Sequence, residues 1–186
     1  MFQLIVHGRG GQGAKTLAML LAEAAIASGK YAQAYPEFGP ERTGAPVRAF
    51  LRVDSAPIIT REPIVKPDMV VILDESLLAG DNTVSVGKSS SVLINSNKSP
   101  AEFVKVFEDR YEYGGKVYVV DTRSIVTKYQ TKVHFSAPLI GRIMKITELL
   151  SLEEITKVYR KKFAEKLGED VIDDTVTAIE DGYAEP

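Results

Sequence analysis

The chain has 186 residues, of which 45% are hydrophobic and 26% are charged, as in ordinary globular proteins. Its formal net charge of −2 gives no electrostatic reason to expect a nucleic-acid or membrane partner. Cysteine is absent, which excludes disulfides and an iron–sulfur cluster held by this chain itself, and two histidines make an all-protein transition-metal site unexpected.

No targeting or membrane segment is apparent, so we expect a cytoplasmic protein. The first residues, MFQLIVHGRGG, lack the basic region and apolar core of a signal peptide. The longest apolar-rich stretch, residues 17–27, contains Glu23 and is too short to span a bilayer.

The first 35 residues predict a strand, a glycine-rich turn, a helix and a second strand. Residues 2–6 form a short apolar run of the kind found in buried parallel strands. Residues 14–28 are dense in alanine and leucine and end at Gly29, which is typical of a helix closed by glycine. Residues 31–35 predict the second strand, and a long loop rich in proline and glycine, PEFGPERTGAP, follows it.

The middle of the chain predicts the rest of a mostly parallel sheet. Residues 47–53 and 58–64 alternate apolar and polar residues, which predicts an antiparallel strand pair. Three further segments read as strands, each ending in Asp or Asn: 68–74, 91–95 and 116–121. Because ligands collect at the carboxyl edge of open α/β sheets, these polar ends mark the edge where a site is expected.

After residue 133 the pattern becomes helical. Pro138 begins a helix that runs to about residue 150, and Ser151 with Glu154 forms a capping box for the next one. We therefore predict an α/β, Rossmann-like fold with helices on both faces of the sheet, an antiparallel strand pair and a helical C-terminal segment. Residues 1–186 are expected to form one domain, with an α/β core over about 1–133 and a helical part over 134–186.

The turn GRGGQGAKT, residues 8–16, resembles two nucleotide-binding loops. The pattern Gly8-x-Gly10-x-x-Gly13 between a strand and a helix matches the dinucleotide fingerprint, but no acidic residue closes the second strand to hold the ribose. A P-loop needs lysine directly after its last glycine, and here Ala14 intervenes. One extra residue turns Lys15 by about 100° around the helix, away from the phosphates that it must neutralise.

Three segments in order carry a family resemblance: GRGGQGAKT, GKYAQAYPEFGPERTGAPVRAFLRV and KPDMVVILDESLL. Together they resemble the gamma subunit of 2-oxoacid:ferredoxin oxidoreductases, from about Phe2 to Leu78 and more loosely beyond. Each motif alone is weak, whereas the ordered set is specific.

This resemblance implies a subunit that does not itself catalyse the reaction. Enzymes of that family use thiamine diphosphate to decarboxylate a 2-oxoacid oxidatively, transfer the acyl group to coenzyme A and pass electrons to ferredoxin. It implies alpha, beta and delta partner subunits that carry the thiamine diphosphate, Mg and [4Fe-4S] clusters, while this chain holds none of them alone. It also implies contacts between the gamma chain and coenzyme A.

Two loops supply the candidate binding residues. In the first, backbone N–H groups of the glycines would meet phosphate oxygens and Arg9 would add charge. In the second, Arg42 would meet a phosphate or carboxylate, with Glu41 orienting it, or the pair would dock the subunit. The glycines, likewise, either contact the ligand or pack against a partner, and Gln12 either donates to a phosphate or caps the turn. The full candidate set is Gly8, Arg9, Gly10, Gly11, Gln12, Gly13, Glu41, Arg42, Thr43 and Gly44.

Two questions stay open at this point. The run ERTGAPVRAF is more similar to pyruvate-type gamma chains than to the 2-oxoglutarate type, so pyruvate is expected first, with branched-chain and aryl 2-oxoacids as alternatives. The alternative to a subunit is a free-standing Rossmann-type nucleotide-binding protein.

Overall fold

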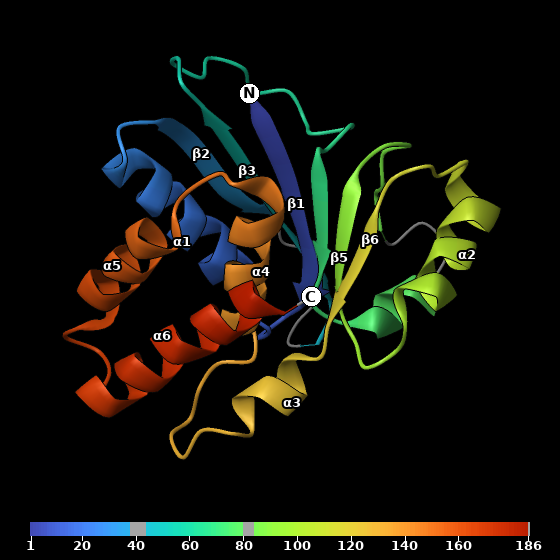
Figure 1. Cartoon of the computed structure of the whole chain (residues 1–186). Coiled ribbons are helices and arrows are strands. Elements are labelled where there is room, and N and C mark those ends of the chain that lie inside the picture. The colour runs from blue at the N-terminus through green and yellow to red at the C-terminus, as the bar shows by residue number, and fades with distance from the viewer. Residues whose placement is uncertain (38–43, 80–83, 186) are drawn as a thin grey trace.

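The computed structural model describes residues 1–37, 44–79 and 84–185, and these contain a six-stranded sheet with helices on both faces (Figure 1). The order across the sheet is β2-β3-β1-β4-β5-β6. The strands are β1 (Phe2–Arg9), β2 (Tyr31–Glu37), β3 (Pro46–Asp54), β4 (Met69–Ile72), β5 (Ser91–Asn95) and β6 (Val117–Val120).

The antiparallel part of the sheet differs from the prediction. Strand β3 pairs antiparallel with both β1 and β2, while β1, β4, β5 and β6 pair in parallel. The prediction of a partner strand at residues 58–64 is wrong, because that segment does not form a strand. Pro57 and Pro63 lack N–H donors for a ladder, and the segment is held instead by side chains of the sheet.

Those side chains come from β2 and β3. Gln33 Nε2 donates to the carbonyl of Ile58 over 2.9 Å, and the Arg52 guanidinium donates to the carbonyl of Glu62. Ile64 packs with Ile5 and Phe50 in a small apolar cluster. An irregular strap, rather than a helix, therefore covers this part of the sheet.

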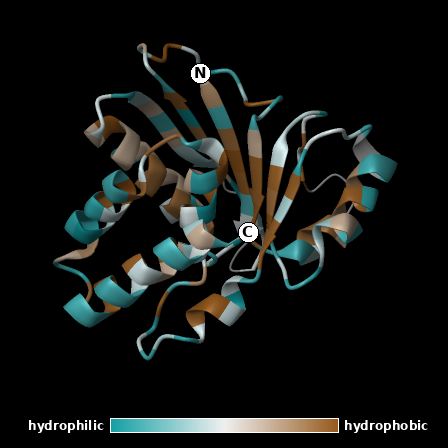
Figure 2. Ribbon diagram, in the orientation of Figure 1, coloured by the Kyte–Doolittle hydropathy of each residue, from teal (hydrophilic) through white to brown (hydrophobic). Residues whose placement is uncertain are grey.

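The helices are divided between the two faces. Helices α1 (Ala14–Ala27), α4 (Ala137–Thr147), α5 (Leu152–Phe163) and α6 (Glu169–Ala184) share the larger apolar core with the sheet. On the other face, the 3-10 helix η1 (Glu75–Ala79) and α2 (Pro100–Tyr111) pack on β4 and β5. The short helix α3 (Thr122–Val126) follows β6. Figure 2 shows hydrophobic residues concentrated along the strands and hydrophilic ones on the outer sides of α5 and α6.

Local signals account for several helix ends. Gly29 has φ 80°, so the first helix closes with a left-handed glycine as predicted. The capping box of Ser151 and Glu154 is present at the start of α5. A second capping box, Ser99 with Glu102, begins α2, a helix that the sequence reasoning did not identify.

The C-terminal residues belong to the fold. Residues 181–184 form the last turn of α6. In the part of the chain that the structure describes, no helix combines the length and apolarity needed to cross a membrane.

Candidate ligand site at the switch point

The chain leaves the carboxyl edge of the sheet toward opposite faces after two adjacent strands. Strand β1 leads into α1 on the larger core face, and its parallel neighbour β4 leads into η1 on the other. Figure 1 shows the ends of these strands together at the lower edge of the sheet. Such a topological switch point is where open α/β folds bind ligands.

The glycine turn, defined as Gly8–Gly13, connects β1 to α1 at this point. Gly11 and Gly13 have φ angles of 94° and 83°, a left-handed backbone that favours glycine. The backbone N–H of Gln12 donates to the carbonyl of Arg9 over 3.0 Å. Gly13 is the N-cap of α1 and supplies no side-chain acceptor to its first turn. The turn thus places an uncapped helix start at the switch point, the arrangement that binds anions in other proteins.

Arg9 extends from the turn toward the loop after β4. Its Nε lies 3.2 Å from Asp74 Oδ2, and its other guanidinium nitrogens donate to Ser76 Oγ over 2.8 Å and to the carbonyl of Gly44 over 3.2 Å. The side chain is about one third exposed. The positive charge of Arg9, which was expected to attract a phosphate, is therefore partly neutralised by the Asp74 carboxylate. Arg9 also connects the glycine turn with the loop after β4 and with Gly44.

Gln12 closes the turn on itself. Its Oε1 accepts the backbone N–H of Arg9 over 2.7 Å, and its Nε2 donates to Asp74 Oδ2 over 2.9 Å. Both ends of the Gln12 amide thus hydrogen-bond within the chain and brace the turn. Burial acts to raise the pKa of Asp74, but hydrogen bonds from Ser76 and Gln12, with the charge of Arg9, outweigh it and hold that pKa below its ordinary value. Asp74 is therefore ionised at neutral pH.

The end of the second loop lies against the glycine turn. The pairing of β1 with β3 runs to Arg9 opposite Pro46, and the N–H of Gly10 donates to the carbonyl of Ala45 over 2.9 Å. The N–H of Gly10 is thus used within the chain. The candidates Glu41, Arg42 and Thr43 lie outside the described residues, whereas Gly44 is described, with φ 91°. The structure brings Gly44 and the glycine turn together, as a two-loop surface requires.

Other polar residues of this edge have structural partners. Asn95 donates to the carbonyl of Leu73 and accepts from Thr122, and Asp121 caps α3 by accepting the N–H of Ser124. His7 is buried, and its Nε2 accepts the N–H of Ser85 over 3.4 Å. Of the three predicted polar strand ends, Asp74 alone joins the glycine turn.

Sequence reasoning missed one neighbour of the turn. His134, 121 positions after Gly13, lies so close that a Cβ on Gly13 would be 2.8 Å from its Cε1 atom. Nothing in the local pattern around His134 signals this contact, because it depends on how the segment before α4 packs over the start of α1. The contact of Arg9 with Ser76 was also missed, because it depends on how the loop after β4 lies against the glycine turn.

Comparison with known proteins decides the family. The family model described as pyruvate ferredoxin/flavodoxin oxidoreductase matches residues 3–185, nearly the whole chain. The chain belongs to this family. Within the oxidoreductase family it corresponds to the gamma, or PorC, subunit, as the resemblance of the three ordered segments predicted, and a free-standing nucleotide-binding protein is not favoured.

The relatives of this oxidoreductase subunit match it over at least 91% of its length. Pyruvate synthase subunit PorC of Thermotoga maritima is 39% identical, over 99% of this chain and 94% of its own. A crystal structure of the PorC subunit from that organism matches with a TM-score of 0.81, over 99% of this chain and 96% of its own. The common gamma subunit of the pyruvate/ketoisovalerate oxidoreductases of Pyrococcus furiosus is 40% identical, over 91% and 90%.

The same fold occurs inside a longer oxidoreductase chain. The 2-oxoglutarate:ferredoxin oxidoreductase of Magnetococcus marinus, solved with 2-oxoglutarate, coenzyme A and succinyl-CoA bound, matches with a TM-score of 0.77 at 17% identity. The match covers 98% of this chain and 30% of that one. At this level of identity the likeness concerns the fold alone.

Proposed function

We propose that this gamma subunit serves a complex that oxidatively decarboxylates a 2-oxoacid, pyruvate first, to acyl-CoA and passes electrons to ferredoxin or a similar acceptor. Alpha and beta partners would carry thiamine diphosphate and Mg, and a delta partner the [4Fe-4S] clusters. The relative from Thermotoga maritima is a subunit of pyruvate synthase, and the one from Pyrococcus furiosus is common to pyruvate and ketoisovalerate oxidoreductases. A branched-chain 2-oxoacid is therefore the second candidate substrate.

In that complex this chain would contribute to the coenzyme A site through its two loops. The observation that carries the proposal is the uncapped start of α1 at the switch point, with left-handed glycines at Gly11 and Gly13. A helix start attracts an anion by roughly 0.3–1 kcal/mol when exposed, and coenzyme A brings a pyrophosphate and a ribose phosphate. The turn and the second loop, residues 41–44, would line this site together.

Asp74 limits how the phosphate would be held. Since Asp74 lies 3.2 Å from Arg9, the guanidinium is already partly neutralised. The N–H groups of Arg9, Gly10 and Gln12 already have acceptors within the chain. Backbone N–H groups in the first turn of α1, rather than the charge of Arg9, would then provide most of the attraction. Arg9 would mainly fix the turn relative to Ser76 and Gly44.

A matched pair of substitutions at Gly11 tests the coenzyme A contact. Gly11 is exposed, and a Cβ there would have open space within 4 Å. Asp and Asn have nearly the same shape and both tolerate the left-handed backbone better than other residues, so the pair differs in charge alone. In the complete complex, Gly11→Asp should raise KM for coenzyme A about tenfold relative to Gly11→Asn, with kcat unchanged, because a carboxylate would repel the phosphates.

Two controls complete the experiment. KM for the 2-oxoacid should be the same in both variants, and both should assemble with the partner chains. Equal KM values for coenzyme A in two assembled variants would show that the glycine turn does not meet a phosphate.

A further inference from the structure

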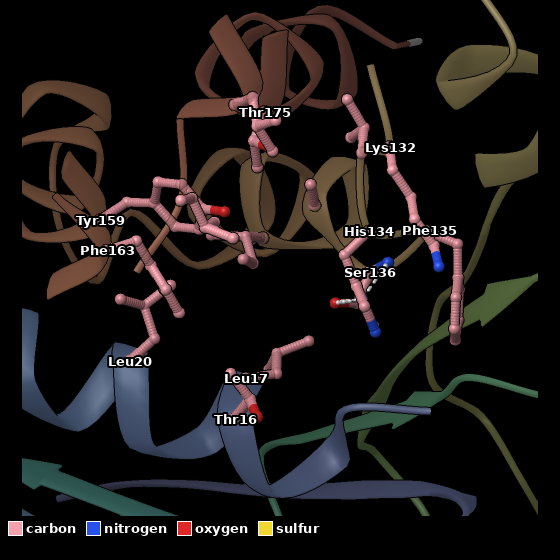
Figure 3. Close-up of a pocket in the computed structure, with 15 residues that line it drawn as sticks. Thr16, Leu17, Leu20, Lys132, His134, Phe135, Ser136, Tyr159, Phe163 and Thr175 are labelled. Carbon is pink, nitrogen blue, oxygen red and sulfur yellow. Dashed lines mark hydrogen bonds between the residues drawn. The ribbon is translucent and has the colours of Figure 1, made fainter. Parts of the chain in front are cut away.

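A cavity of about 520 Å³ lies beside the glycine turn, between α1 and the C-terminal helices (Figure 3). Its walls come from α1, α4, α5, α6 and residues 132–136. Sites for small molecules commonly have volumes of roughly 300–1,000 Å³. The size of the cavity therefore suits a small ligand.

One side of the cavity is apolar and fixed by the fold. Leu20 and Ile140 are at most 4% exposed and belong to the larger core. Phe163 and Tyr159 add two aromatic rings, with centroids 4.6 Å apart. Figure 3 shows these two rings across the cavity from His134. Because burial of apolar surface is favourable, this side suits the hydrocarbon part of a ligand.

The opposite side presents an N–H donor of His134. The backbone N–H of Ser136 donates to His134 Nδ1 over 3.3 Å, and the Ser136 hydroxyl oxygen lies 2.7 Å from the same atom. Since a backbone N–H can only donate, Nδ1 is an acceptor, and the hydrogen of the neutral ring is on Nε2. Burial lowers the pKa of His134, which keeps the ring neutral at pH 7. Within residues 1–37, 44–79 and 84–185 the Nε2–H has no hydrogen-bond partner, so it is available to an acceptor on a ligand.

The charge of the lining favours an anion on this side. Among the described residues that line the cavity, none is acidic and Lys132 is the one cation. Lys132 and His134 are both exposed, so a charged group between them would keep part of its hydration. Farther in, the Thr175 hydroxyl already donates to the carbonyl of Val171 over 2.7 Å. The cavity therefore combines an end that favours an anion with an apolar end.

We propose that this cavity binds an aliphatic monocarboxylate, whose carboxylate accepts the Nε2–H of His134 and whose hydrocarbon chain lies against the rings of Tyr159 and Phe163. His134 also lies against Gly13 at the start of α1, so the bound carboxylate would occupy part of the proposed coenzyme A surface. Competition with coenzyme A therefore rests on the proposed function, whereas binding to the chain itself does not.

Two probes with eight carbons, octanoate and 1-octanol, test the site by NMR on the full chain. The chain has two histidines, and the buried His7 does not line the cavity. Octanoate should shift the imidazole signals of His134 saturably and leave those of His7 unchanged. It should bind about tenfold more tightly than 1-octanol, because a charge-assisted hydrogen bond is stronger than a neutral one. Equal affinity for the two probes, or no saturable shift at His134, would overturn the proposal.

The role of the His134 N–H is tested by His134→Phe, which keeps a ring beside Phe135. With affinities measured from the signals of the probes, this variant should lower the affinity for octanoate to that for 1-octanol and leave 1-octanol unaffected. His7→Gln is the control, because it removes the other histidine and should change neither affinity. Unchanged octanoate binding in His134→Phe, or an equal loss for both probes, would contradict the assigned hydrogen bond.

The location of the probes is tested by filling the cavity. Leu20→Phe should weaken both probes at least tenfold, whereas Met19→Phe, one position along α1 and outside the lining, should not. If Leu20→Phe does not fold, Leu167→Trp places a ring over the cavity from a lining position that is 37% exposed. Unchanged binding in a folded filling variant would place the probes elsewhere and refute the site.

Competition is tested in the complete complex. Octanoate at a concentration equal to its Kd for the chain should raise KM for coenzyme A about twofold without changing kcat, and His134→Phe should remove this effect. Octanoate that binds the chain but leaves KM unchanged would refute the shared surface. Absence of octanoate binding, in a chain whose Gly11 variants still differ in KM for coenzyme A, would refute the carboxylate site and leave the proposed function intact.

Discussion

At the scale of single residues, two glycines of the same turn have different reasons to be glycine. Gly11 and Gly13 both have a left-handed backbone, which costs other residues about 1–2 kcal/mol. Only at Gly13 does a neighbour also occupy the space of a side chain, namely the ring of His134. A side chain would thus cost backbone strain at both positions, and a steric clash at Gly13 as well.

Replacing each glycine by alanine should separate these costs. We expect Gly11→Ala to lower the free energy of unfolding by about 1 kcal/mol and Gly13→Ala by about 2–3 kcal/mol, measured by urea denaturation. In a His134→Ala background the extra loss at Gly13 should disappear, because the ring that meets its Cβ is gone. A full extra loss in that background would mean that another contact is responsible.

His7 should make stability depend on pH. Burial, followed by the charge of Arg48, lowers its pKa from 6.5 to about 4. Between these values the unfolded chain binds a proton that the folded chain does not, so the free energy of unfolding falls as pH drops from about 6.5 to about 4. This pKa shift corresponds to a loss of up to about 3 kcal/mol in the free energy of unfolding.

The variant His7→Gln isolates this contribution, because glutamine does not titrate and can accept the Ser85 N–H. The difference in unfolding free energy between wild type and variant should shrink from pH 7 to pH 4.5. A constant difference across that range would show that His7 does not titrate in the window.

At the scale of secondary-structure elements, the crossing of α4 and α6 depends on two glycines. A Cβ on Gly141 would lie 1.8 Å from the carbonyl oxygen of Ile179, and one on Gly182 would lie 2.0 Å from that of Pro138. The two helices therefore touch backbone to backbone, and this contact fixes α6 against α4. A wall of the cavity comes from both helices.

Alanine at Gly182 should force the helices apart, because a backbone carbonyl cannot move aside as a flexible side chain can. We expect Gly182→Ala to lower the free energy of unfolding by about 3 kcal/mol. Gly114→Ala serves as the control, since its nearest atom would be 4.0 Å from the new Cβ. A loss at Gly182 no larger than that at Gly114 would contradict the close crossing.

At the scale of the whole molecule, this chain lacks the groups that its family's chemistry needs. It has no cysteine, so any iron–sulfur cluster must be held by other chains. A pull-down of the chain from its native cell, followed by mass spectrometry, should recover three further chains, one of them rich in cysteine. Recovery of a lone monomer or homodimer would contradict the proposed complex.

The sequence by itself determined the fold class, the family and the position of the first loop. Short-range patterns sufficed for these, because apolar runs, Gly29 and the Ser151–Glu154 box act within a few residues. Those patterns could not separate a strand from a strap at residues 58–64, where Ile64 is buried but prolines interrupt the ladder. They predicted that residues 134–186 are helical, but not where α6 packs, because its place depends on contact with Gly141.

Only the tertiary structure decided what surrounds the glycine turn. The contacts of Arg9 with Asp74 and Ser76, and of Gly13 with His134, join residues 65–121 positions apart, so no local pattern encodes them. The cavity likewise exists because α1, α5 and α6 meet around it. The sequence pattern alone predicts the glycine turn, but the charges around it, its neighbours and the cavity beside it result from tertiary packing.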